Sequence, residues 1–106
     1  MISTEWIRNF CLSLANTEEH PHFIKKAYKV KKRIFATLDF EAKKLTLKLT
    51  EIDQSVFCDF KPDKIYPANG AWGKQGWTSF EFSELHEEML TDAITLAYNN
   101  VSVKKK

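Results

Sequence analysis

The sequence predicts an α+β domain of two layers, in which helices cover one face of a single antiparallel sheet. Segments with apolar residues three and four positions apart alternate with segments in which every second residue is apolar. Their order is helix, three strands, helix, two strands, helix. The strands are polar on their second face, as expected where an antiparallel sheet meets water. The length of 106 residues is near the commonest size of one domain.

Three segments have the apolar spacing of helices. Residues 4–15 form the first, with Ser3 as the expected N-cap. Residues 51–60 form the second, where Thr50 and Asp53 resemble a capping box. The third runs over residues 84–100, with Ser83 as the expected N-cap. Each carries an apolar stripe that predicts burial against the sheet.

Five segments alternate or cluster like strands: residues 23–30, 33–40, 44–49, 65–66 and about 77–82. Lys31-Lys32 joins the first two. This pair is unusual in a two-residue turn, which favours positive φ, so either the loop is longer or the turn is strained. Residues 67–76 contain all three glycines and predict a flexible loop that carries Trp72.

The domain is expected to span residues 1–103, followed by a disordered basic tail at 104–106. No segment is long and apolar enough to span a membrane, and the start lacks the pattern of a signal peptide. Cys11 and Cys58 lie far apart in apolar contexts. They predict buried packing thiols in a reduced, cytoplasmic protein without a disulfide framework.

Charge is strongly segregated although the net charge is only +2. Residues 25–48 contain nine Lys and Arg against two acids, whereas residues 49–103 contain three Lys against nine acids. A basic segment of this kind indicates an anionic partner, or lysines that keep a sheet face soluble and guard its edges. Strand alternation gathers a basic set with one aromatic on the outward face: Lys25, Lys29, Arg33, Phe35, Thr37, Lys44, Thr46 and Lys48.

Several stretches together resemble the MmcQ/YjbR family of small bacterial domains. They are Glu19-His20-Pro21, Ala27-Tyr28-Lys29-Val30, Ile34-Phe35-Ala36, Leu45-Thr46-Leu47-Lys48, Gly76-Trp77 and Leu96-Ala97-Tyr98. The resemblance implies the same α+β fold, with relatives among CyaY-like and secretion-chaperone-like domains, and a DNA-binding function. The sequence departs from the family pattern at Lys31-Lys32, where the family has Gly-Gly, and at Ala97, where it has Ser. The missing Ser removes a catalytic role at that position.

No group of residues predicts an enzyme, a metal site or a cofactor. His20 and His22 are the only close histidine pair and lack further ligands, so a solvated loop is the preferred interpretation. The glycine-rich loop lacks the Gly-Lys-Ser/Thr ending of a P-loop. Neither cysteine has a histidine near it in the chain that would make a nucleophile.

We therefore expect double-stranded DNA to bind the basic sheet face, through backbone contacts with little sequence specificity. Trp77 is expected to pack in the core, whereas Trp72 either stacks on a base or packs locally. The alternative is an adaptor or chaperone-like module that takes an acidic protein or peptide on the same sheet. The residues assigned to nucleic-acid binding are Lys25, Lys29, Lys31, Lys32, Arg33, Lys44, Lys48 and Trp72.

Overall fold

A computed structural model describes residues 2–22 and 25–102 of the chain. The expected tail at 104–106 and the expected start of a strand at residues 23–24 lie outside the described residues. Within that part of the chain, no helix is long and apolar enough to cross a membrane.

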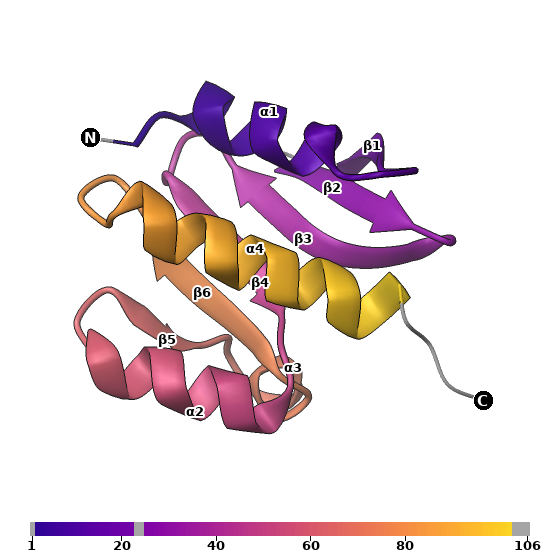
Figure 1. Cartoon of the computed structure of the whole chain (residues 1–106). Helices are drawn as coiled ribbons and strands as arrows, with labels where there is room; N and C mark the ends of the chain where they lie inside the picture. The colour runs from indigo at the N-terminus through magenta and orange to yellow at the C-terminus, as the bar shows by residue number, and fades with distance from the viewer. Residues whose placement is uncertain (1, 23–24, 103–106) are drawn as a thin grey trace.

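The elements follow the predicted order, with two additions. They are α1 (Thr4–Ser13), β1 (Glu18–His22), β2 (Lys25–Val30), β3 (Arg33–Asp39), β4 (Lys44–Lys48), α2 (Glu51–Phe60), β5 (Ile65–Pro67), α3 (Ala71–Lys74), β6 (Trp77–Glu81) and α4 (Glu87–Ser102). The α+β class is confirmed (Figure 1). Sequence reasoning missed the strand β1 and the short helix α3, which it had treated as loops.

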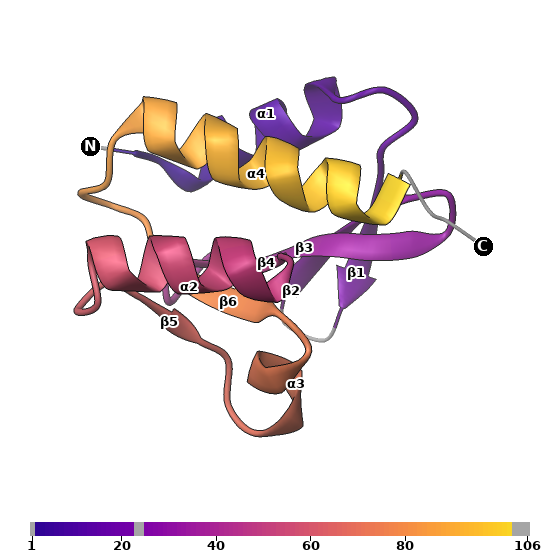
Figure 2. The same ribbon diagram turned by 60° about the horizontal axis from the view of Figure 1, so that its bottom comes forward.

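The strands form one six-stranded sheet in the order β1-β2-β3-β4-β6-β5, and every neighbouring pair is antiparallel. Its two edge strands, β1 and β5, each contain a proline, Pro21 and Pro67. Figure 2 shows α1 and α4 over one side of the sheet and α3 below the strands.

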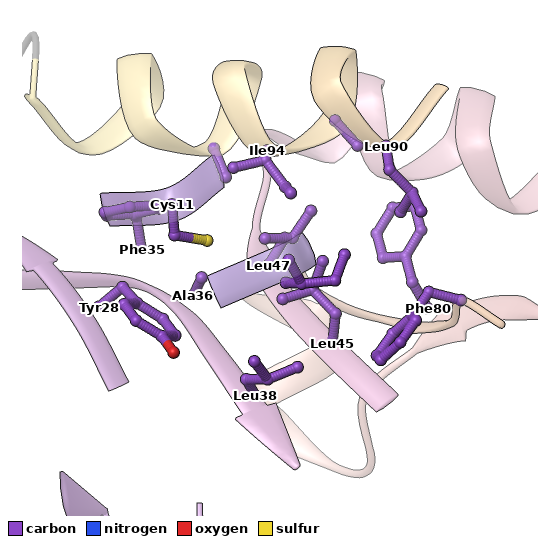
Figure 3. Close-up of a cluster of buried hydrophobic side chains, with 14 of the residues drawn as sticks. Cys11, Tyr28, Phe35, Ala36, Leu38, Leu45, Leu47, Phe80, Leu90 and Ile94 are labelled. Atoms are coloured by element: carbon purple, nitrogen blue, oxygen red, sulfur yellow. The ribbon is translucent and has the colours of Figure 1, made fainter. Parts of the chain in front are cut away.

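The register separates the two faces of the sheet. Four residues opposite one another across β3, β4, β6 and β5 are all fully buried: Leu38, Leu45, Phe80 and Ile65. They face the helices and join Ile94 and Leu90 of α4 in the core (Figure 3). The next row along the strands points the other way because successive side chains alternate. That row consists of Thr37, Thr46, Ser79 and Tyr66. It lies on a face of the sheet without helices, called here the open face.

A β-bulge in the second strand pair corrects the predicted position of Phe35. Lys29 pairs with Ile34, whereas Tyr28 pairs with Ala36, so Phe35 is the extra residue. Its ring is fully buried and meets Tyr98 of α4 edge to face, 5.5 Å between centroids. Phe35 therefore belongs to the core, and Ile34 takes the place on the open face that the simple alternation gave to Phe35.

Two of the three predicted N-caps are observed. The hydroxyl of Ser3 accepts a hydrogen bond from the Trp6 amide, and the hydroxyl of Thr50 accepts one from the Asp53 amide, as predicted. The prediction for the last helix was wrong at its start. Ser83 lies in a turn in which the Leu85 amide donates a hydrogen bond to the Phe82 carbonyl. Helix α4 begins only at Glu87.

The hairpin between β2 and β3 has a strained two-residue turn. Lys31 and Lys32 both have positive φ, 53° and 67°, which is the mark of a type I′ turn. The Lys31 ammonium also donates to the carbonyl of Ser102 at 3.0 Å, at the C-terminal end of α4 where a cation is favoured. Of the two possibilities left open by the sequence, the strained turn is the one observed.

The outer surface of α2 carries an apolar stripe. Ile52, Val56 and Phe60 lie four positions apart and are 76%, 61% and 66% exposed. Phe57, on the adjacent side of the helix, meets Phe80 of the core edge to face. The predicted burial of the α2 stripe was therefore wrong, and among the described residues α2 packs through its Phe57 side.

Candidate nucleic-acid interface

A groove of about 500 Å³ lies on the open face of the sheet. It crosses the middle strands and is bounded on one side by α3 and the loops around it. Its lining residues come from β1 to β6, from α3 and from the loop before α3: His22, Lys25, Ile34, Thr37, Lys44, Thr46, Tyr66, Pro67, Ala68, Asn69, Trp72, Trp77 and Ser79. A volume of this size is in the range of small-molecule sites in proteins.

The floor of the groove is a row of small hydroxyl side chains. Thr37, Thr46 and Ser79 are direct cross-strand neighbours on β3, β4 and β6, and Tyr66 continues the row on β5. The row next to it on the same strands is the buried row of the core, so the floor is fixed by the packing beneath it. The short side chains leave room above the sheet for a ligand.

One end of the groove is aromatic. Trp72 of α3 is 63% exposed, and its ring meets that of Trp77 edge to face with centroids 6.4 Å apart. The expectation that Trp77 packs in the core was wrong. Trp77 lies opposite Lys48 on the open face and is half-buried in the groove wall.

Backbone contacts hold this aromatic wall in place. Gly76 has a φ of 103°, and a Cβ there would lie 2.0 Å from the carbonyl oxygen of Leu49. Gly73 is equally confined, with the Ala68 carbonyl 2.1 Å from a Cβ position. The side chain of Gln54 in α2 donates to the carbonyls of Gly73 and Trp77, at 2.9 and 3.2 Å. The two glycines therefore permit a close approach that larger residues would prevent.

Lysines border the groove beside and beyond the hydroxyl row. Lys25 of β2 and Lys44 of β4 both line it. Lys44 lies between Asp39 and Glu81 in the strand register, and its ammonium is 5.6 Å from the centre of the Tyr66 ring. The positive charge of Lys44 is thus partly offset by the carboxylates of Asp39 and Glu81.

Tyr66 is held by Glu81. Its hydroxyl donates to the Glu81 carboxylate, and this bond raises the pKa of Tyr66, with burial adding to the effect. Glu81 also lies 3.8 Å from the ammonium of Lys64. The ring of Tyr66 is therefore fixed as part of the wall and remains a neutral phenol near neutral pH.

The predicted binding lysines fall into two groups. Lys25, Lys29, Lys44 and Lys48 belong to the open face, as the alternation predicts. Lys29 lies opposite Glu18, and the Lys48 ammonium donates to the Gln75 carbonyl.

The other predicted basic residues lie at the end of the β2–β3 hairpin. Lys31 and Lys32 form the turn. Arg33 is opposite Val30, whose side chain is buried under the helices, so Arg33 belongs to that side of the hairpin. The predicted set therefore does not form one surface, and its open-face members are interleaved with acids.

The histidine pair lies on the edge strand β1 and not in a loop. The ring of His20 is 3.0 Å from the Glu18 carboxylate. Among residues 2–22 and 25–102, no three His, Cys, Asp or Glu side chains are close enough to hold a metal ion together.

Comparison with known proteins supports the resemblance noted from the sequence. The family model of YjbR matches residues 12–100. The chain belongs to the YjbR family. Comparison with the curated proteins gives no match.

A solved structure shares the fold of this YjbR-family chain. The crystal structure of Deinococcus radiodurans protein DR2400, which has a DUF419 domain, superimposes with a TM-score of 0.85 at 22% sequence identity. The alignment covers 98% of the present chain and 81% of the other. This likeness confirms the fold.

Several groove residues of this YjbR-family protein were missed by sequence reasoning. Ser79 and Tyr66 are the clearest cases, because both extend the hydroxyl row of Thr37 and Thr46. The alternation of β6 offered a signal, since Trp77, Ser79 and Glu81 share one face and Thr78, Phe80 and Phe82 are buried. The pairing of β4 with β6, which brings these residues together, was not available from periodicity.

Proposed function

We propose that this protein binds DNA on the open face of its sheet, mainly through contacts with the phosphate backbone. The observation that carries the proposal is the groove, which combines the exposed ring of Trp72 with hydroxyl groups and ammonium groups on a face that no helix covers. Lys25 and Lys44 line the groove, and Lys29 and Lys48 extend the basic set along the same face. Ammonium groups bind phosphate oxygens without regard to base sequence.

The proposal assigns a binding role and not a catalytic one, and it places the protein in the cytoplasm. The two cysteines are free thiols, which supports a reducing compartment. The acids on the open face set the expected strength of binding. Because Glu18 faces Lys29 and two carboxylates flank Lys44, Lys25 and Lys48 are expected to make the largest contributions.

Salt dependence of duplex binding tests the proposal. Each phosphate neutralised by a lysine releases condensed counterions, so about four contacts would give a log–log slope of roughly −3.6. We expect the double variant Lys25→Ala/Lys48→Ala to flatten this slope by about 1.8. Fluorescence anisotropy of a labelled duplex, titrated with protein at several salt concentrations, measures both slopes.

The matched control removes the same charge elsewhere. Lys26 lies opposite Leu38, on the face toward the helices, and Lys61 follows α2. The variant Lys26→Ala/Lys61→Ala should keep the parent slope. Equal slopes for the two double variants would show that the open face is not the binding site. A lack of binding at about 50 mM salt, together with capture of an acidic peptide, would favour the adaptor function instead.

A further inference from the structure

The groove on the open face is built asymmetrically. One end is formed by Trp72 and Trp77, the floor by the hydroxyl groups of Thr37 and Thr46, and Lys25 borders the far side on β2. Three strand spacings, about 14 Å, separate β6 from β2. A ligand that lies along the groove would therefore meet aromatic rings first, then hydroxyl groups, then an ammonium group.

The aromatic end is suited to a flat ring. Trp72 and Trp77 meet edge to face, so their faces are not stacked on each other. Trp72 is also held out in solvent by a four-residue helix whose base is fixed by the Gln54 contact with the Gly73 carbonyl. An exposed indole is the kind of platform on which nucleobases stack, and it accepts any base because every base has a π-face.

A base inside a duplex cannot reach this platform. Both of its faces are covered by neighbouring base pairs, and only its edges are open in the grooves of the DNA. The open face of the sheet also has no long helix that would enter a major groove, since α3 spans only Ala71–Lys74. An unpaired base, in contrast, can turn into a concave site and stack on an aromatic side chain.

We propose that this groove takes one unpaired nucleobase stacked on Trp72, with phosphates of the same strand toward Lys44 and Lys25, so that the protein prefers single-stranded to duplex DNA. This inference rests on the proposed function. The hydroxyl groups of the floor both donate and accept hydrogen bonds, so they bind the edges of different bases without selecting one. Sequence preference should accordingly be weak.

Three DNA probes of equal length, about 15 nucleotides, separate base stacking from backbone binding. They are an oligothymidylate, an abasic oligomer with the same sugar-phosphate backbone, and a mixed-sequence duplex. We expect the oligothymidylate to bind at least about 5-fold more tightly than either of the others, and to quench tryptophan fluorescence. Trp72→Ala should weaken oligothymidylate binding by about 5- to 150-fold, and Trp72→Phe should retain most of the affinity.

Phe60→Ala is the matched control, because Phe60 is an aromatic residue of similar exposure on α2, 66% against 63% for Trp72. It should leave the affinity for the oligothymidylate unchanged. Binding of all three probes with equal affinity, unaffected by Trp72→Ala, would overturn the inference and leave the proposed function standing. Failure of all three to bind at low salt would overturn both. A fluorescence response to a polyglutamate peptide, but not to the oligothymidylate, would assign the groove to an acidic protein partner.

Discussion

Glu19 joins three elements through its carboxylate. It accepts hydrogen bonds from the Arg8 guanidinium of α1, at 2.8 and 3.3 Å, and from the Tyr28 hydroxyl of β2 at 2.9 Å, while its own backbone lies in β1. The bond from Arg8 is the main cause that lowers the pKa of Glu19, and the bond from Tyr28 contributes in the same direction. The carboxylate therefore ties α1 and the edge of the sheet together more strongly in its ionised form.

This linkage predicts a pH-dependent contribution to stability. Because the folded-state pKa is lowered, the contribution is complete above the unfolded-state pKa of about 4.3 and is lost as the pH falls through the folded-state pKa. Urea unfolding of the parent and of Glu19→Gln should differ most at about pH 7 and converge on acidification. Glu84→Gln, which changes an exposed acid, should follow the parent. A constant difference between parent and Glu19→Gln at all pH values would contradict the linkage.

The two thiols are expected to differ in reactivity. Burial raises the pKa of Cys11 to about 12, and burial also raises the pKa of Cys58, which is only partly enclosed. Since the thiolate is the reactive form, a disulfide reagent at about pH 8 should modify Cys58 slowly and leave Cys11 intact until the protein is unfolded. Peptide mapping after labelling measures this. Labelling of Cys11 at the rate of Cys58 would show that the core under α1 opens readily.

At the scale of the element, the β2–β3 hairpin shows where sequence reasoning succeeds and where it fails. The alternation of both strands located the hairpin, and the Lys31-Lys32 pair correctly raised the question of strain. The bulge that turns Phe35 inward could not be predicted, because it depends on the fit of one ring against Tyr98 of α4, far along the chain. Local periodicity does not contain such a contact.

The edge strand β1 was missed for a related reason. Its sequence contains two acids, two histidines and a proline, none of which favours a strand, and the pairing with β2 decides its conformation. The helix α3 is too short for an apolar stripe to identify it. Of the groove wall, sequence reasoning therefore identified only Trp72, whereas the lysines and hydroxyl groups on β2, β3 and β4 followed from alternation.

Replacing the second turn residue should relieve the strain in the hairpin. A left-handed conformation costs a residue with a Cβ roughly 1–2 kcal/mol, and glycine avoids this cost. Lys32→Gly should therefore raise the free energy of unfolding by about 1 kcal/mol, measured by urea denaturation. Lys29→Gly, near the end of β2, provides the contrast and should be destabilising. If Lys32→Gly also lowers stability, the turn is not strained at that position.

At the scale of the whole molecule, one core serves both the helix layer and the groove. Leu38, Leu45 and Phe80 pack against α2 and α4 on one side, and their strand neighbours Thr37, Thr46 and Ser79 form the groove floor on the other. The sequence was sufficient for this two-layer arrangement, because alternation assigns strand residues to a face, except around the bulge at Phe35. The order of the strands came only from the structure.

The domain should be stable without metal or reductant. Its core is a continuous apolar cluster with contributions from α1, α4 and the strands, and Cys11 lies in it as a free thiol. Thermal unfolding followed by circular dichroism should give the same midpoint with and without a chelator. A chelator-induced drop of several degrees would point to a metal site and return attention to the histidines of β1.

The prolines of the two edge strands have a consequence for how copies of the protein behave together. An exposed sheet edge is a template on which a strand from another chain can be added, and proline lacks the amide that such pairing needs. Pro21 and Pro67 interrupt the donor row at opposite ends of the sheet. Chains should therefore stay separate at high protein concentration, and Pro21→Thr/Pro67→Thr should form aggregates that bind thioflavin sooner than the parent does.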